Sequence, residues 1–294
     1  LLGKAKRKYT SSIKRVGVRG NIYDGTHSNP HLLATSQVTY DVLASPLRMG
    51  SRQQEVLEKI VRLTGVSEHK LRTRFASGKQ EVVIKNKVEE LLVSRLRHMK
   101  LPGLRYVQSS RRIYPKDSLA SHIIGYMNEH SNGVSGVEKV YDSELQPTAG
   151  YSSFERTPKG HRVLHLAEKK ALDGKDIYLT IQEPIQEIVE DELDRLMAEV
   201  KPKACYAIMA NPRTGAIMAL AQRPTFNPND RKTMTSKNYG LSPHFLLDVY
   251  DPGSTMKAIS IGGALHYNPH LTMGTKFYCE KGLWYYGGRR LRDA

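Results

Sequence analysis

Apolar residues occur only in short runs along this 294-residue chain, and this pattern limits what it can fold into. The longest runs, residues 204–210 and 216–221, have the length of β-strands and fall far short of the ~18 residues that a membrane-spanning helix needs. Hydrophobic residues make up 39% of the chain and charged residues 25%, which is ordinary for globular domains and excludes a disordered or collagen-like chain. At ~150 residues per domain, the length predicts two domains.

Short strand patterns and amphipathic helices alternate through the first half of the chain. Strands are predicted over residues 15–23 and 37–44, helices over 53–63 and 118–124, and a strand followed by an amphipathic helix within 66–100. Gly65 is the expected C-terminal stop of the first of these helices. We expect the resulting sheet and helices to form one α+β domain over residues 1–172.

The second half begins with a strand pattern over residues 176–180, followed by helical spacing of apolar residues up to residue 200. Thr180 and Glu183 have the spacing of a capping box, and Pro184 is tolerated in a first turn. A β-hairpin is predicted from the two apolar runs over 204–221, which a Pro/Gly turn joins. We therefore predict a second domain over residues 173–294.

Charge and cysteine content narrow the classes of partner. The net charge is +16, and most of the excess lies in residues 1–150. No nucleic-acid recognition motif accompanies it, so a solvated surface is the simplest interpretation and no nucleic-acid partner is predicted. The basic run over residues 4–8 is interpreted as the flank of a membrane anchor that precedes the chain. Two cysteines exclude a disulfide scaffold and a Cys₄ zinc site. The spacing does not decide whether Cys205 and Cys279 form a disulfide. No cofactor and no metal site are predicted.

The strongest chemical signal is the sequence Asp-Pro-Gly-Ser-Thr-Met-Lys at residues 251–257. Pro-Gly interrupts the chain, so Ser254 is predicted at the start of a helix, with Lys257 one turn later on the same face. A serine hydroxyl becomes nucleophilic when a base removes its proton, and a lysine is such a base when burial lowers its pKa. The apolar residues 258–265 are expected to form a buried helix that supplies this environment. Ser254 is the predicted nucleophile and Lys257 the predicted general base.

With this motif in place, the chain resembles the class B penicillin-binding proteins, and the division-type branch more closely than the elongation-type branch. The segments that carry the resemblance follow the family's order along nearly the whole chain: residues 19–24, 112–115, 124–126, 133–138, 179–181, 211–217 and 251–257. The family's later S-x-N and K-T-G elements do not follow Ser254. The S-x-N letters at residues 236–238 precede that serine and are interpreted as unrelated.

The resemblance implies an elongated non-catalytic pedestal domain, followed by the incomplete start of a transpeptidase domain with an antiparallel sheet flanked by helices. It implies a peptidoglycan D,D-transpeptidase that cross-links stem peptides through a serine acyl-enzyme in septal wall synthesis and that β-lactams inhibit. A division glycosyltransferase and other divisome proteins, a lipid-linked precursor, and a single-pass anchor in the bacterial inner membrane with periplasmic domains would accompany this activity.

Two alternatives stay open at this point. The first is a non-catalytic envelope or division scaffold with the same fold, and the second is a β-lactam sensor or β-lactamase relative. We also expect the chain to be truncated at both ends, and on its own to bind no penicillin.

Overall fold

The computed structural model describes residues 10–26, 28–156, 162–230, 232, 234 and 239–292. The basic run at residues 4–8 and the S-x-N letters at residues 236–238 lie outside these ranges. The chain divides into two compact units, residues 1–247 and 248–294, which are described separately. Within the described ranges, no helix combines the length and the apolar character of a membrane span. The predicted division between residues 172 and 173 stays a prediction.

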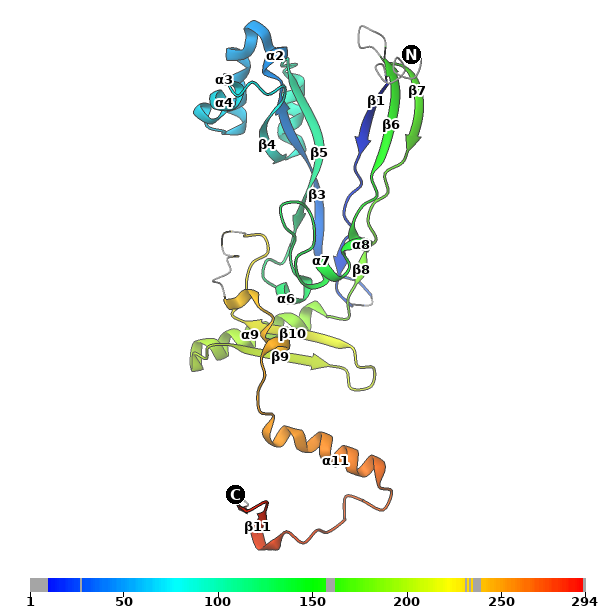
Figure 1. Cartoon of the computed structure of the whole chain (residues 1–294), viewed down its shortest axis with the longest axis vertical. Coiled ribbons are helices and arrows are strands. Elements are labelled where there is room, and N and C mark those ends of the chain that lie inside the picture. Colours follow the sequence, from blue (N-terminus) through cyan, green and yellow to red (C-terminus); the bar gives the residue numbers. More distant parts are fainter. Residues whose placement is uncertain are drawn as a thin grey trace. The chain divides into compact units, whose positions relative to one another are not determined.

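A long antiparallel pair of strands is the central element of the first unit (Figure 1). Strand β3 (Leu32–Ala44) pairs with β5 (Leu104–Ile113) over ten residues, from Thr35 opposite Ile113 to Ala44 opposite Leu104. Its C-terminal part also pairs with β4 (Val82–Val88), and its first residues pair with β2 (Ile22–Tyr23). Strand β8 (Ile177–Tyr178) runs parallel to β2 and completes the sheet.

Helices pack around one end of the β3–β5 pair and enclose the larger hydrophobic core (Figure 1). They are α2 (Pro46–Met49), the 3₁₀ turn η1 (Gly50–Arg52), α3 (Gln53–Thr64), α4 (Glu68–Phe75) and α5 (Glu90–His98). Helix α3 ends at Gly65 in the left-handed conformation, which confirms the predicted helix and its stop. Helix α4 was missing from the prediction, because only Leu71 and Phe75 of its eight residues are buried and the apolar pattern is correspondingly weak.

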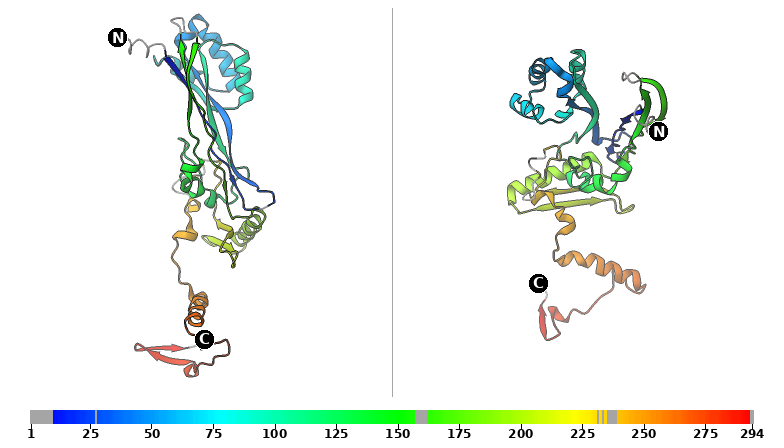
Figure 2. Two further views of the ribbon diagram at one scale, coloured as in Figure 1. Left: turned by 90° about the vertical axis from the view of Figure 1, so that its right-hand side faces the viewer. Right: turned by 45° about the horizontal axis from the view of Figure 1, so that its top comes forward.

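A second, three-stranded sheet consists of β1 (Thr10–Arg15), β6 (Gly150–Arg156) and β7 (Arg162–Lys169), all antiparallel. Figure 2 shows it as a sheet separate from the β3–β5 pair. The single strand predicted over residues 15–23 is therefore wrong, since β1 ends at Arg15 and β2 begins at Ile22. Between these strands, backbone N–H groups donate to aspartate carboxylates rather than to a neighbouring strand. Asp173 Oδ1 accepts from Val18 N and Asp176 Oδ1 accepts from Asn21 N, each at 2.7 Å.

Three short helices, α6 (Ser121–Ile124), α7 (Gly136–Val140) and α8 (Asp142–Leu145), lie at the other end of β3 (Figure 1). Leu145 and Ile124 join Ile22, Leu33 and Tyr114 in a second buried cluster. The helix predicted over residues 118–124 is confirmed in its second half. The preceding residues form turns, with Leu119 N bonding Lys116 O and Ser121 N bonding Ser118 O.

A fully buried carboxylate ties these short helices to the sheet. Glu138 Oε1 accepts from Arg112 Nε at 2.6 Å, and Glu138 Oε2 accepts from Arg19 Nε at 2.8 Å. Arg19 also reaches Asp142 at 2.7 Å, while the Tyr114 hydroxyl donates to Glu138. Segments around residues 19, 112 and 138 thus meet in one ion cluster, although up to 119 residues separate them along the chain.

The first unit continues with helix α9 (Glu183–Val200) and the hairpin β9 (Cys205–Ala210) and β10 (Ile217–Arg223), which confirms the predicted helix and hairpin. The buried Gln186 side chain joins them, because its amide donates to Leu220 O and its carbonyl accepts from Leu220 N, both at 2.8 Å. A 3₁₀ turn η2 (Tyr239–Leu241) and α10 (His244–Leu247) end the unit.

The predicted capping box at the start of α9 is wrong. The Thr180 hydroxyl donates instead to Ile217 O at 2.7 Å, and no side chain of the α9 N-cap residue bonds to the helix. The backbone N–H of Glu183 donates to Asp24 Oδ2 at 3.0 Å, so a buried carboxylate 159 residues away caps the helix. The N-terminus of α9 is therefore capped by Asp24, which is distant in the sequence, and not by the nearby Thr180.

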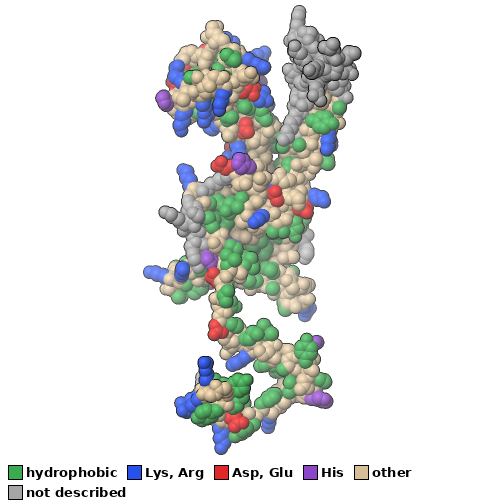
Figure 3. Space-filling model, in the orientation of Figure 1, with side chains coloured by type: hydrophobic (Ala, Val, Ile, Leu, Met, Phe, Trp, Pro, Cys, Tyr) green, Lys and Arg blue, Asp and Glu red, His purple; other side chains and the backbone are tan. Residues whose placement is uncertain are grey.

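The second unit contains the 3₁₀ turn η3 (Gly253–Thr255), helix α11 (Met256–Tyr267), the turn η4 (Glu280–Gly282) and the antiparallel hairpin β11 (Leu283–Tyr286) and β12 (Arg289–Arg292). Hydrophobic side chains are visible over its surface (Figure 3). None of its described residues, 248–292, is buried. The predicted helix is confirmed, but its predicted burial is wrong in this chain.

Candidate active site

The turn before α11 is built from the residues of the predicted motif. Asp251 Oδ1 accepts a hydrogen bond from Gly253 N at 3.1 Å. Gly253 has a φ of +54°, a conformation that glycine adopts without the steric cost of a side chain. Thr255 then bonds back to Pro252 O through both its backbone N and its hydroxyl. The Asp-Pro-Gly sequence therefore sets the direction in which the helix begins.

Ser254 lies at the centre of η3, and Lys257 is the second residue of α11. The backbone is helical through this junction, with Thr255 at φ −64° and ψ −24°. A separation of three residues along a helical backbone brings the two side chains to one side of the helix. The structure thus places the serine at the predicted start of the helix, and both side chains are exposed.

The apolar side chains of α11 lie in solvent in this chain. Ile259 is 69% exposed, Ile261 56% and Leu265 36%. A lysine becomes a base near neutral pH through desolvation or a neighbouring cation, and the exposed start of α11 provides no desolvation. The motif therefore has its turn and helix in this chain, but Lys257 lacks the enclosed environment that a general base requires.

The cysteines and the histidine, aspartate and glutamate side chains are the other groups with chemical potential. Cys205 and Cys279 are free thiols that belong to different units, and burial raises the pKa of Cys205. Within the described residues, no three His, Cys, Asp or Glu side chains form a group that could hold a metal ion. His31 contacts Asp24, with 3.2 Å between His31 Nδ1 and Asp24 Oδ2.

Comparison with known proteins connects both units to one family. Residues 14–179 match the family model of the penicillin-binding protein dimerisation domain, and residues 205–293 match that of the penicillin-binding protein transpeptidase domain. The chain belongs to the class B penicillin-binding proteins. The predicted family is confirmed, as is the α+β fold with a dimerisation domain followed by part of a transpeptidase domain.

Curated relatives of this penicillin-binding protein include members named for different processes. Stage V sporulation protein D of Bacillus subtilis is 28% identical over 98% of the chain and 44% of its own length. Peptidoglycan D,D-transpeptidase MrdA of Acinetobacter baumannii is 30% identical over 85% of the chain and 40% of its own length. Peptidoglycan D,D-transpeptidase FtsI of Buchnera aphidicola is 32% identical over 58% of the chain and 30% of its own length. The chain thus spans less than half the length of these relatives, and they do not distinguish the two branches.

Solved structures show the same fold. Penicillin-binding protein 2X from Streptococcus thermophilus superposes with a TM-score of 0.71 at 24% identity, over 96% of this chain and 45% of that one. A complex between PBP2 and MreC from Helicobacter pylori gives 0.72 at 21% identity, over 97% of this chain and 57% of that one.

Proposed function

We propose that this chain is part of a peptidoglycan D,D-transpeptidase that cross-links stem peptides in septal cell-wall synthesis. The motif at residues 251–257 carries the proposal, since it folds as a turn that delivers Ser254 and Lys257 to the start of a helix. It lies inside the region that matches the transpeptidase domain, and relatives at 30% identity and above are named D,D-transpeptidases.

In the proposed reaction, Lys257 accepts the proton of the Ser254 hydroxyl, and Ser254 Oγ attacks the carbonyl carbon of the penultimate D-Ala. The peptide bond to the terminal D-Ala breaks, and this residue leaves as its amine with the proton that Lys257 carried. The acyl-enzyme then transfers its acyl group to the amine of a neighbouring stem peptide, which frees Ser254. Backbone N–H groups at the start of α11 are suited to stabilise the negative charge on the carbonyl oxygen.

The apolar side chains of α11 are exposed in this chain, whereas the proposed reaction needs an enclosed Lys257. A base such as Lys257 requires desolvation, so we propose that the remainder of the transpeptidase domain covers the apolar residues of this helix. We further propose a location on the periplasmic side of the bacterial inner membrane, with a division glycosyltransferase as a partner. The Helicobacter pylori complex, in which PBP2 is bound to MreC, supports a role for protein partners in this family.

The test is covalent labelling of the full-length protein with a fluorescent penicillin, which acylates the serine nucleophile. Ser254→Ala is expected to abolish labelling. Ser260→Ala is the matched control, because Ser260 lies in the same helix and its hydroxyl bonds only to Met256 O in the described structure. Labelling that persists in Ser254→Ala contradicts the assignment, and a full-length protein that never labels supports the non-catalytic scaffold instead.

A further inference from the structure

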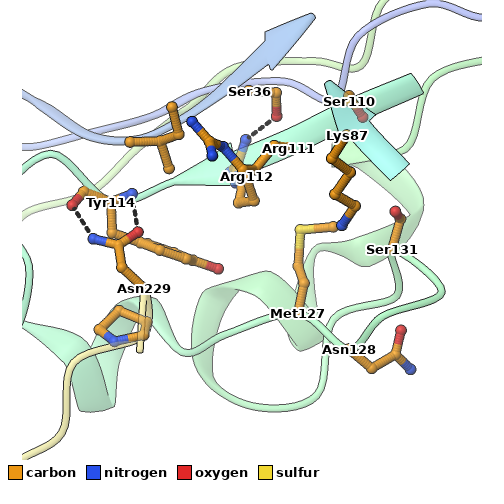
Figure 4. Close-up of a pocket in the computed structure, with 12 residues that line it drawn as sticks. Ser36, Lys87, Ser110, Arg111, Arg112, Tyr114, Met127, Asn128, Ser131 and Asn229 are labelled. Atoms are coloured by element: carbon orange, nitrogen blue, oxygen red, sulfur yellow. Dashed lines mark hydrogen bonds between the residues drawn. The ribbon is translucent and has the colours of Figure 1, made fainter. Parts of the chain in front are cut away.

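A pocket of about 420 Å³ lies against the β3–β5 pair in the first unit (Figure 4). Its size is within the range of sites for small molecules. Strands supply Ser36, Ser110 and Arg112, and the segment after α6 supplies Asn128 and Ser131. All of these residues belong to the first unit, so the pocket is separate from the Ser254 motif.

Lys87, at the end of β4, is the unusual member of this lining. Its φ of +54° is rare for a residue with a side chain, and strained backbone of this kind concentrates at functional sites. Asp41 Oδ1 holds this conformation by accepting from Lys87 N at 2.8 Å. Lys87 and Met127 both line the pocket, and Figure 4 shows the Lys87 side chain extended. Lys87 as a residue is half-buried, and no acceptor among the described residues bonds to its ammonium, so a positive charge lies in the pocket without a partner.

The two arginines of the lining already have acidic partners for their charges, although the buried Arg112 Nη2 forms no hydrogen bond. Arg112 Nε bonds to the buried Glu138 at 2.6 Å, and Arg111 lies 3.6 Å from Glu89. No aspartate or glutamate is among the residues that line the pocket. Lys87 therefore leaves one positive charge uncompensated, and a ligand with a single negative charge balances it.

The uncharged groups favour a carboxylate attached to a peptide-like body. Ser36 Oγ accepts from Arg112 Nη1 at 2.9 Å, so its own proton is available to a ligand. The Asn128 carbonyl accepts from two backbone N–H groups, His130 at 2.9 Å and Asn132 at 3.0 Å, which leaves the amide NH₂ as a donor. The hydroxyls of Ser110 and Ser131 also line the pocket. Together these groups can form hydrogen bonds with both a carboxylate and a peptide bond.

We propose that this pocket binds the carboxylate end of a small peptide, with the Lys87 ammonium as its counter-ion. Hydroxyls and the Asn128 amide would bind the remaining polar atoms of the ligand. A phosphate group is a poorer match, because it carries about −1.5 to −2 charges at pH 7 against one unpaired lysine. This site is independent of the proposed transpeptidation.

The experiment is isothermal titration of the 294-residue chain with N-acetyl-Ala-Ala, its C-terminal amide, and inorganic phosphate. The free acid is expected to bind at least ten-fold more tightly than the amide or phosphate. Lys87→Met is expected to weaken binding of the acid at least ten-fold. Lys70→Met is the matched control, because this exposed lysine of α4 forms no hydrogen bond or ion pair within the described structure, and we expect less than a two-fold change.

Asn128→Asp provides a second variant in case Lys87→Met does not fold. Its carboxylate keeps the acceptor for the two backbone N–H groups, but it repels an anion, so binding is again expected to fall at least ten-fold. Equal affinity for acid and amide, tighter binding of phosphate, no binding of the acid at millimolar concentration, or unchanged binding in both pocket variants would each overturn the proposal.

Discussion

Asp24 shows how one buried carboxylate connects distant parts of the first unit. Its oxygens accept from the Thr26 hydroxyl, from the backbone N–H of His31 at 2.7 Å and from the backbone N–H of Glu183 at 3.0 Å. Burial by itself raises the pKa of this group, but the hydrogen bonds outweigh it and lower the pKa from 3.8 to about 2. Ionised Asp24 is therefore a stabilising group in the folded state.

This shift predicts a pH dependence of stability. Because the folded pKa lies below the unfolded one, the stabilisation is complete above pH 5 and is lost as the pH falls towards 2. A lowering from 3.8 to about 2 corresponds to about 2 kcal/mol in the free energy of unfolding. We expect Asp24→Asn to lose about this amount at pH 6, and its difference from the wild type to narrow between pH 5 and pH 2.

Urea unfolding at a series of pH values measures this difference. Asp191→Asn is the matched control, since Asp191 is an exposed residue of α9 without a hydrogen bond in the described structure. We expect it to remain within about 0.5 kcal/mol of the wild type. A difference between Asp24→Asn and the wild type that stays constant from pH 6 to pH 2 would show that the carboxylate does not act through its charge.

Helices and strands with strong periodic patterns could be predicted from the sequence. Helix α3 ends at Gly65 as its spacing indicates, and the β9–β10 hairpin forms around the predicted Pro/Gly turn. The errors occur where distant residues provide the bonds. Asp24 replaces the capping box of α9, and Asp173 and Asp176 replace strand neighbours before β2. Local spacing contains no information about partners more than 150 residues away.

The same limit applies to the two sites. The Ser254 motif could be found because its turn and helix start are local, and they fold as the residues indicate. Lys87 gave no signal in the sequence, since its significance depends on a strained backbone and on a lining that five separate segments provide. Neither property is visible in a run of alternating lysines and apolar residues.

The contact between α6 and α7 depends on a glycine. Gly125 follows α6 with a φ of +77°, and a Cβ at this position would lie 1.9 Å from Ser135 O, a backbone atom that cannot move aside cheaply. Gly78 has a similar φ of +71°, but nothing lies within 4 Å of the corresponding position. A comparison of substitutions at Gly78 and Gly125 therefore separates two free-energy costs, that of the left-handed backbone conformation and that of steric overlap with Ser135.

We expect Gly78→Ala to lower the free energy of unfolding by about 1 kcal/mol, which is the cost of a left-handed residue with a side chain. Gly125→Ala bears the same cost and must also displace the backbone at Ser135, so we expect a loss of about 3 kcal/mol or more. Chemical denaturation of the two variants measures both values. Equal losses would show that the α6–α7 contact adjusts freely.

At the scale of the whole molecule, the two units differ in what they bury. The first encloses two hydrophobic clusters and the Glu138 ion cluster, whereas no described residue of the second is buried. Regions with few buried apolar contacts open locally at low free-energy cost. The protein thus joins a well-packed N-terminal part to a segment whose helix carries the serine motif but has little tertiary packing in this chain.

Hydrogen exchange of the 294-residue chain should therefore separate the units. We expect the amides of α11 to exchange within seconds, while those of β3 and β5, which pair over ten residues, stay protected for at least a hundred-fold longer. The same chain should not react with fluorescent penicillin, because Lys257 is exposed and lacks the desolvation that a base requires. Protection of α11 equal to that of β3, or stoichiometric labelling of this chain at Ser254, would mean that the motif is already enclosed, and that the exposed apolar face of α11 does not describe its state in solution.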